Sequence, residues 1–257
     1  MAPDSVATPT RQIMNVDGLL RCSRYAFGPN RLHYCGPDAN QELFSYIDNE
    51  VVDPGLENLL KAFRTMYPYL RMIADANHVR DAFDDRVVEA YWIGNSLLKN
   101  VETNTFYDHL RYEQQLGKRM GWEEVTKLGE KIVRGAVPHH SFHVLDVWRR
   151  TGNLDQAHTL SSMDSCRISW GKVLTADGPK ITVATEPLIR QGDLLALGPI
   201  VNKTIARSLG AELDIENLQP GQIITVHWDV PCEVITPAQA TILKRLTLNH
   251  IRLANIA

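Results

Sequence analysis

The chain has 257 residues, of which 44% are hydrophobic and 22% are charged, and its formal net charge at pH 7 is −3. This composition is typical of a soluble globular protein with one large domain or two modest ones. The acidic balance argues against nucleic-acid binding, because phosphate recognition requires a basic face. No apolar run approaches the roughly 20 residues of a membrane span. We therefore expect a cytoplasmic protein.

The predicted elements change in character near residue 160. Residues 1–14 are polar and rich in proline and threonine, and we expect a flexible leader there. Across residues 15–162, apolar side chains recur at helical spacing, which predicts an all-α domain. Residues 163–257 contain short β-rich stretches bounded by glycine, proline and aspartate, and then one amphipathic helix. The sequence therefore predicts an α+β protein, with a helical domain followed by a small β-barrel domain that ends in a helix.

Individual helices and strands are predicted from capping residues, from glycine and proline breaks, and from the spacing of apolar residues. The expected helices are 39–49, 54–78, 84–101, 103–120, 121–135, 138–153 and 237–255. The expected strands are 166–175, 180–189, 192–198 and 221–235.

An aromatic- and arginine-rich segment, 24-RYAFGPNRLHYCGPD-38, contains two Gly-Pro pairs and is expected to be a loop. A structural linker is the favoured interpretation. The alternative is a ligand-binding loop, because long ordered loops often line a site. In that case Arg24, Arg31, His33 and Cys35 would bind an anionic ligand or line a metal pocket.

Three histidines gather in 138-PHHSFHVLDVW-148 at an expected helix start. His139 and His143 are spaced i, i+4, and His140 and His143 are spaced i, i+3, which suits two imidazoles on one metal ion. Glu89 lies in the apolar run 87–98, where we expect it to be buried, and His109 could join it. A buried carboxylate with histidines from several helices is a ligand set for iron or manganese. The alternative is that these histidines cap a helix and form hydrogen bonds.

In the C-terminal part, 163-MDSCRISWGKV-173, 221-GQIITVHWD-229 and 235-ITPAQATILKRL-246 follow one another in a recognisable order. This series resembles the small hydrogenase-maturation chaperones of the HypC/HupF type. The first segment matches their Met-Cys start and Pro-Gly-Lys-Val motif, except that Trp170 stands where that family has proline. Cys166 is also internal here, and the loop 199–219 lengthens the barrel.

The resemblance implies an OB-like barrel that carries an iron unit with cyanide and carbon monoxide ligands to the nickel-iron hydrogenase large subunit. It implies that Cys166 and His227 hold the iron. A thiolate suits such soft iron, and Asp229 would orient the imidazole from the second coordination sphere. The alternative is that Cys166 is a small core residue and His227 a hydrogen-bonded strand histidine.

Three functional hypotheses result. The first is an accessory factor for nickel-iron hydrogenase maturation that binds or delivers the iron unit, with the large subunit or other maturation proteins as partners. The second is a metal-dependent enzyme, a non-haem iron site in a haem-oxygenase-like bundle that uses the histidine cluster. The third is a non-catalytic scaffold. The chain lacks nucleophile-elbow, phosphate-loop and dinucleotide motifs, so any catalysis is expected to depend on a metal.

Overall fold

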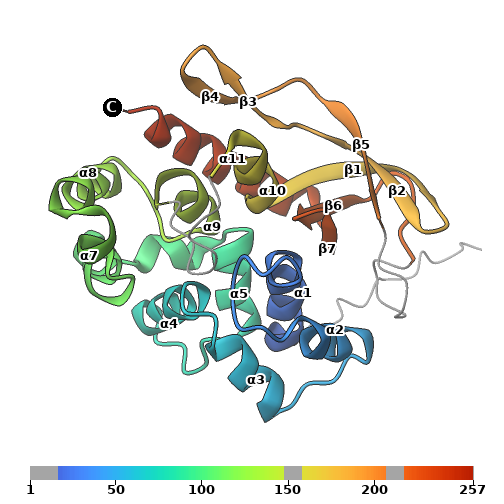
Figure 1. Cartoon of the computed structure of the whole chain (residues 1–257), viewed down its shortest axis with the longest axis horizontal. Helices are drawn as coiled ribbons and strands as arrows, with labels where there is room; N and C mark the ends of the chain where they lie inside the picture. The colour runs from blue at the N-terminus through green and yellow to red at the C-terminus, as the bar shows by residue number, and fades with distance from the viewer. Residues whose placement is uncertain (1–16, 148–157, 207–216, 257) are drawn as a thin grey trace, which may run out of the picture.

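The computed structural model describes residues 17–147, 158–206 and 217–256. The predicted leader, residues 1–14, lies outside them, as does the end of the predicted helix 138–153. The described part is α+β, with an N-terminal helical region, antiparallel strands and a C-terminal helix (Figure 1). At this level the predicted fold class is confirmed. No helix in the described ranges is both long enough and apolar enough to cross a membrane.

The helical region consists of short helices. They are α1 (Gly18–Asn30), α2 (Asn40–Asp48), α3 (Pro54–Lys61), α4 (Met66–Ala76), α5 (Asp85–Trp92), the 3-10 helix η1 (Ser96–Asn100), α6 (Thr103–Asp108), the π-helix η2 (His109–Glu113), α7 (Leu116–Met120), α8 (Trp122–Val133), α9 (His140–Phe142) and the π-helix η3 (His143–Val147). Aspartates begin several of them, as expected: the Asp53 carboxylate accepts from the N–H groups of Gly55 and Leu56 at the start of α3.

Several predictions in this region were wrong. The predicted helix 84–101 is divided into α5 and η1, and the predicted helix 103–120 is divided into α6, η2 and α7. The predicted helix 54–78 is divided into α3 and α4, with Phe63 buried at the break. The predicted loop 24–38 is helical as far as Asn30, because α1 continues through Pro29 in its last turn. Pro29 has no N–H, so α1 lacks the helical hydrogen bond that this position would otherwise donate.

The strands are β1 (Ser169–Asp177), β2 (Lys180–Thr185), β3 (Leu188–Gln191), β4 (Leu194–Leu197), β5 (Val201–Ala206), β6 (Ile223–His227) and β7 (Val230–Ile235). Five form an antiparallel sheet in the order β5-β2-β1-β6-β7, and β3 pairs with β4 in a separate hairpin. Strand β5 lies in the predicted loop 199–219, part of which is outside the described residues.

The predicted β-barrel is not found, because the sheet is open between β5 and β7 in the described part of the chain. The sheet nevertheless curls until these two edges approach one another. Lys203 in β5 forms an ion pair of 2.6 Å with Asp229 in the turn after β6. A side-chain contact, and no ladder of backbone hydrogen bonds, therefore joins the edges.

Two further helices connect the strands to the helical region. The helix α10 (Leu160–Cys166) precedes β1, so Cys166 ends a helix and does not begin a strand as predicted. The domain boundary expected between residues 162 and 163 falls within α10. The predicted C-terminal helix is confirmed as α11 (Pro237–Ala254), which begins with a capping box between Thr236 and Gln239.

The larger of the two apolar clusters among the described residues joins the two parts of the chain. Tyr25 of α1, Val226 of β6 and Leu243 of α11 belong to the same buried cluster. Figure 1 shows α11 running from the strands towards the helices, where it contacts α9 and η3. The helical region and the sheet therefore share an interior, and the candidate site lies at their junction.

Candidate metal centre

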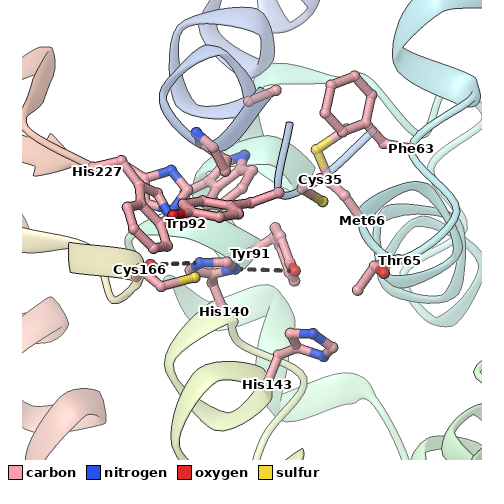
Figure 2. Close-up of a pocket in the computed structure, with 14 residues that line it drawn as sticks. Cys35, Phe63, Thr65, Met66, Tyr91, Trp92, His140, His143, Cys166 and His227 are labelled. Carbon is pink, nitrogen blue, oxygen red and sulfur yellow. Dashed lines mark hydrogen bonds between the residues drawn. The ribbon is translucent and has the colours of Figure 1, made fainter. Parts of the chain in front are cut away.

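His140, Cys166 and His227 come together where three elements end (Figure 2). His140 is the first residue of α9, Cys166 is the last residue of α10, and His227 is the last residue of β6. One imidazole nitrogen from each histidine and the Cys166 sulfur all lie within 4.8 Å of one another. The structure thus unites one histidine of the predicted helical cluster with the two residues that the family resemblance indicated.

One nitrogen of the His227 ring forms a hydrogen bond that fixes the ring, and the other has no hydrogen-bond partner among the described residues. Its Nδ1 lies 2.7 Å from the backbone oxygen of Tyr25, and because a carbonyl can only accept, Nδ1 carries the proton. Its Nε2 is buried and has no hydrogen-bond partner among the described residues. The Cys166 carbonyl acts to raise the pKa of His227, because its partial negative charge favours the protonated ring. It does not meet the geometry of a hydrogen bond with Nε2. Burial dominates and lowers the pKa of His227 to about 4, which keeps the ring neutral.

The sequence of α1 explains why the Tyr25 carbonyl can accept this bond. In a helix that oxygen would accept from the N–H four residues later, which is position 29. Pro29 has no N–H, so the Tyr25 oxygen remains available to His227. The carbonyl of Tyr25, and not the predicted Asp229, therefore orients the imidazole.

Gly28 lets α1 approach β6 closely. A Cβ at this position would lie 2.4 Å from the backbone oxygen of His227. Beyond His227, the two-residue turn to β7 has positive φ at Trp228 and Asp229. The Trp228 N–H donates to the Ser165 carbonyl at 2.8 Å. These contacts fix the end of β6 against both α1 and α10.

His140 has the same pattern of hydrogen bonds. Its Nε2 lies 2.9 Å from the backbone oxygen of Cys166, so Nε2 carries the proton. Its Nδ1 then has the lone pair and accepts from the Tyr91 hydroxyl at 3.2 Å. Burial, with the neighbouring His227 and His143, lowers the pKa of His140 well below 6.5. Both histidines therefore donate one N–H to a carbonyl, as metal-binding histidines do. They differ in the other nitrogen, which has no partner among the described residues in His227 and accepts from Tyr91 in His140.

Cys166 is the accessible thiol of this group. It is half-buried, whereas Cys22 and Cys232 are fully buried. Burial raises the pKa of Cys22 to about 12 and that of Cys232 well above 9, so neither is suited to form a thiolate. Of the two half-buried thiols that line the cavity, Cys35 and Cys166, it is Cys166 that belongs to the group with the two histidines.

A cavity of about 50 Å³ adjoins the three donors (Figure 2). Its walls are mainly apolar and aromatic and include Phe63, Met66, Trp92 and Trp228. The predicted loop 24–38 contributes four of the lining residues, which are Ala26, Pro29, Tyr34 and Cys35. Because this apolar cavity is small, only small groups fit beside the three donors.

The donor set fits a transition metal ion. Metal–nitrogen bonds of ~2.0 Å and metal–sulfur bonds of ~2.3 Å place tetrahedral donors ~3.3–3.8 Å apart. The donor atoms are up to 4.8 Å apart, so they must move about 1 Å closer together to bind one ion, and side-chain rotation supplies this movement. One thiolate and two imidazoles suit zinc, copper or iron. Three protein donors also leave a coordination position open.

The other histidines of the predicted cluster have different partners. His139 precedes α9 in an extended conformation, and its Nδ1 caps the helix by accepting from the Ser141 N–H at 3.1 Å. The Ser141 hydroxyl also contacts Nδ1 of His250 at 2.6 Å. His143 lines the cavity, but its Nδ1 lies 3.4 Å from the Tyr69 hydroxyl and it is outside the three-residue group. The i, i+4 pair does not form on one helical face because His139 is not helical.

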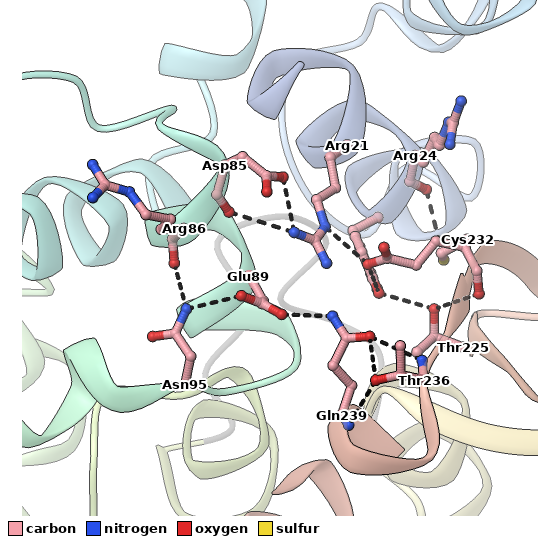
Figure 3. Close-up of polar contacts among 12 residues, drawn as sticks. Arg21, Arg24, Asp85, Arg86, Glu89, Asn95, Thr225, Cys232, Thr236 and Gln239 are labelled. Carbon is pink, nitrogen blue, oxygen red and sulfur yellow. Dashed lines mark hydrogen bonds and ion pairs between the residues drawn. The ribbon is translucent and has the colours of Figure 1, made fainter. Parts of the chain in front are cut away.

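Glu89 and His109 lie apart from the site. Glu89 is half-buried and accepts hydrogen bonds from Asn95 at 3.1 Å and from Gln239 at 2.6 Å, which joins α5 to α11 (Figure 3). His109 is buried with its Nε2 3.2 Å from Gln114, and burial lowers its pKa to about 3. Neither residue is part of the group of three donors.

Two residues of the predicted ligand-binding loop also have other partners. Arg24 lies in α1 and forms an ion pair of 3.6 Å with Glu50. His33 is exposed and pairs with Asp38 at 3.1 Å. Neither lines the cavity, and of the predicted ligand-binding residues only Cys35 does.

Sequence reasoning missed Tyr25 and Tyr91, which form hydrogen bonds with the two histidines of the candidate centre. The signal for Tyr25 was present in Gly28 and Pro29, which were interpreted as a turn. Read as the last turn of a helix, the proline marks a carbonyl without its helical partner. Tyr91 has no comparable signal, because its contact with His140 depends on tertiary packing.

Comparison with curated proteins and with solved structures finds no match to this chain. A family model does match residues 14–257, which include all the residues of the candidate centre. The chain therefore belongs to DUF6390, a family of unknown function.

Proposed function

We propose that this protein binds a transition metal ion through His140, Cys166 and His227. The observation that carries the proposal is the buried Nε2 of His227, which has no hydrogen-bond partner in the described part of the chain. Leaving a buried polar atom unpaired costs ~1–3 kcal/mol, and a bound ion would remove that cost. The neighbouring Cys166 sulfur and His140 nitrogen supply the further donors that an ion needs.

The ion is iron with small strong-field ligands, and the protein is an accessory factor in nickel-iron hydrogenase maturation. The support is the resemblance of residues 163–246 to HypC/HupF chaperones, together with the soft thiolate donor and the small apolar cavity. The expected partners are the hydrogenase large subunit or other maturation proteins. The proposal places the protein in the cytoplasm, where its thiols stay reduced.

A second candidate is a non-haem iron enzyme that uses the same donors. It is favoured by the participation of His140, which comes from the predicted histidine cluster of the helical region. Against it, the carboxylate predicted for such a site, Glu89, is engaged by Asn95 and Gln239. The carrier is therefore the better supported of the two.

The test is anaerobic purification from cells that produce a nickel-iron hydrogenase, followed by metal analysis and infrared spectroscopy. We expect about one iron per chain, with bands from bound cyanide and carbon monoxide. Both should disappear in Cys166→Ala and His227→Ala, while Cys35→Ala, which removes the other half-buried thiol, should retain them. Iron without these bands would favour the enzyme, and a wild-type protein that binds no metal would refute the proposal.

A further inference from the structure

A groove separate from the candidate centre lies between the sheet and the start of α11. It has a volume of about 480 Å³, within the range of roughly 300–1,000 Å³ that is typical of small-ligand clefts. Residues of β1, β2, β6 and α11 line it, and none of them lines the cavity of the candidate centre. The segment 170-WGK-172, which contains the tryptophan that departs from the HypC/HupF motif, lies in this groove. It has no part in the group of three donors.

The register of the sheet explains the floor of this groove. Lys172 of β1 pairs with Ala184 of β2 and with Ile223 of β6, so these three side chains project from the same face. Next to Lys172, Gly171 has no side chain, and a Cβ there would lie 2.8 Å from the backbone oxygen of Ala184. From α11, the small side chain of Ala240 also lines the groove. Small residues therefore keep the space between the sheet and the helix open.

Trp170 forms an aromatic wall of the groove and is held in place. Its ring centroid lies 5.7 Å from the Arg167 guanidinium, and its backbone oxygen accepts from the Thr185 hydroxyl at 2.7 Å. Arg167 is 1% exposed and donates to Asp164 at 2.9 Å, so it supports the ring from a fixed position. Trp170 is half-buried and Ile200 is 69% exposed, so the described residues leave apolar surface in the groove uncovered. Accessible apolar surface in a cleft favours a ligand with an apolar group.

One lysine of the groove has no charged partner among the described residues. Nζ of Lys244 lies 2.9 and 2.7 Å from the two carboxylate oxygens of Glu186, so these two charges offset one another. Lys172 is exposed and forms no ion pair within the described ranges. Because two lysines and one glutamate line the groove, its lining carries a net charge of +1. This charge is complementary to a singly charged anion.

We propose that this groove binds an amphipathic carboxylate, a small molecule in which one carboxylate is attached to an aromatic or aliphatic body. The carboxylate pairs with Lys172, and the apolar body packs against Trp170 and covers Ile200. Inorganic phosphate fits poorly, because it would leave the apolar walls exposed to water. The inference goes beyond the proposed function and does not depend on a metal ion, so either can fail without the other.

The experiment titrates the isotopically labelled full chain with phenylbutyrate and with decanoate, and follows the amide and indole N–H signals by NMR. The signals that shift give the location of the ligand, and their concentration dependence gives the dissociation constant. Phenylbutanol, which lacks the carboxylate, and inorganic phosphate, which lacks the apolar body, are the comparison compounds.

Two variants, each with a matched control, test the two halves of the site. Lys172→Gln removes the unpaired charge, and its control is Lys180→Gln, at an exposed lysine of β2 outside the groove. Ile200→Ser removes apolar surface, and its control is Val133→Ser, at a 78% exposed valine of α8 outside the groove. All four side chains are exposed, so the variants should fold as the wild type does.

We expect both carboxylates to shift the signals of Trp170, Lys172 and Ile200. Lys172→Gln should weaken binding ~5-fold and abolish its dependence on salt concentration, because the charge pair is lost. Ile200→Ser should weaken binding ~3-fold, because less apolar surface is buried. Phenylbutanol should bind the wild type ~5-fold more weakly than phenylbutyrate does. Both control variants should behave as the wild type.

Three results would overturn the proposal. If neither carboxylate shifts the signals of the groove, the groove is not a site for this class of ligand. If Lys172→Gln and phenylbutanol leave the affinity unchanged, the groove recognises apolar surface alone. If phosphate shifts the same signals as strongly as phenylbutyrate, the groove recognises the anion alone and the apolar walls have no role in binding.

Discussion

The backbone oxygen of Tyr25 in α1 and Nδ1 of His227 in β6 are 2.7 Å apart, although the two residues are separated by 202 positions in the chain. The bond exists because Pro29 cannot supply the N–H that a helix would direct at that oxygen. The missing helical hydrogen bond in α1 thus determines the orientation and tautomer of His227, a residue of the candidate centre in the second part of the chain.

Substitution of Pro29 by alanine tests this relationship. The alanine supplies an N–H to the Tyr25 carbonyl, which then competes with His227 for the same acceptor. Loss of such an outer-sphere partner typically weakens metal binding 10–100-fold, and we expect about 10-fold, measured by competition with a chelator. The free energy of unfolding should stay the same or rise, because alanine favours a helix. Unchanged metal affinity would contradict the proposed role of Pro29.

Substitution of Gly28 by alanine should displace the end of β6. The new Cβ would lie 2.4 Å from the His227 backbone oxygen, which cannot rotate away as a side chain could. We expect a loss of about 2 kcal/mol in the free energy of unfolding and weaker metal binding. The control is Gly117→Ala, whose Cβ meets the exposed Trp122 ring at 2.7 Å. That ring can move, so urea denaturation should detect little change in the control.

The buried histidines make stability depend on pH in a defined direction. Burial lowers the pKa of His109 to about 3 in the folded protein, while the unfolded chain has about 6.5. Below pH 6.5 the unfolded state binds more protons, so stability is fully present above that pH and decreases as the pH falls towards 3. Between pH 7 and pH 5, the protonation of His109 in the unfolded state lowers the free energy of unfolding by about 2 kcal/mol.

The measurement is urea denaturation of the metal-free protein at pH 7 and at pH 5. Replacement of His109 by glutamine should reduce the difference in the free energy of unfolding between pH 7 and pH 5 by about 2 kcal/mol. His33 provides the control, because it is exposed and its replacement removes no buried neutral imidazole. An unchanged difference in His109→Gln would contradict the assignment of a neutral buried ring.

A buried ion-pair network supports Tyr25 from the side of the sheet. Arg21 contacts Asp85 at 2.8 Å and Glu233 at 3.0 Å, and the Tyr25 hydroxyl donates to Glu233 at 2.6 Å (Figure 3). Glu233→Gln leaves the shape intact and removes a charge beside a buried guanidinium, so we expect a loss of about 2 kcal/mol in the free energy of unfolding. The control Glu124→Gln removes an exposed pair with Lys127 and should leave stability unchanged.

The local sequence pattern predicted which helices and strands exist better than it predicted where they begin and end. The C-terminal helix was identified because Pro237 and a cap at Thr236 mark its start. The continuation of α1 through Pro29 was missed, because a Gly-Pro pair is more often a turn and only packing against β6 maintains the helix. A small β-barrel was predicted where the described sheet is open, because strand patterns do not specify whether two edges pair.

The candidate site was predicted in separate pieces. Cys166 and His227 followed from a family resemblance, and His140 followed from a histidine cluster assigned to a different domain. Their convergence depends on how α9, α10 and β6 pack, and the sequence contains no local signal for that arrangement. The pairing of His139 with His143 failed for a local reason, since His139 caps its helix from an extended conformation.

The three donors lie at the ends of three elements far apart in the chain, and this has a mechanical consequence. An ion held by all three would act as a cross-link, closing chain loops in the way that disulfides do, and cross-links of that kind contribute ~2–4 kcal/mol. Loss of the ion would then loosen the junction between helices and sheet. A protein that delivers its ion would therefore become more sensitive to proteolysis at this junction when it is empty, which would distinguish the loaded from the spent molecule.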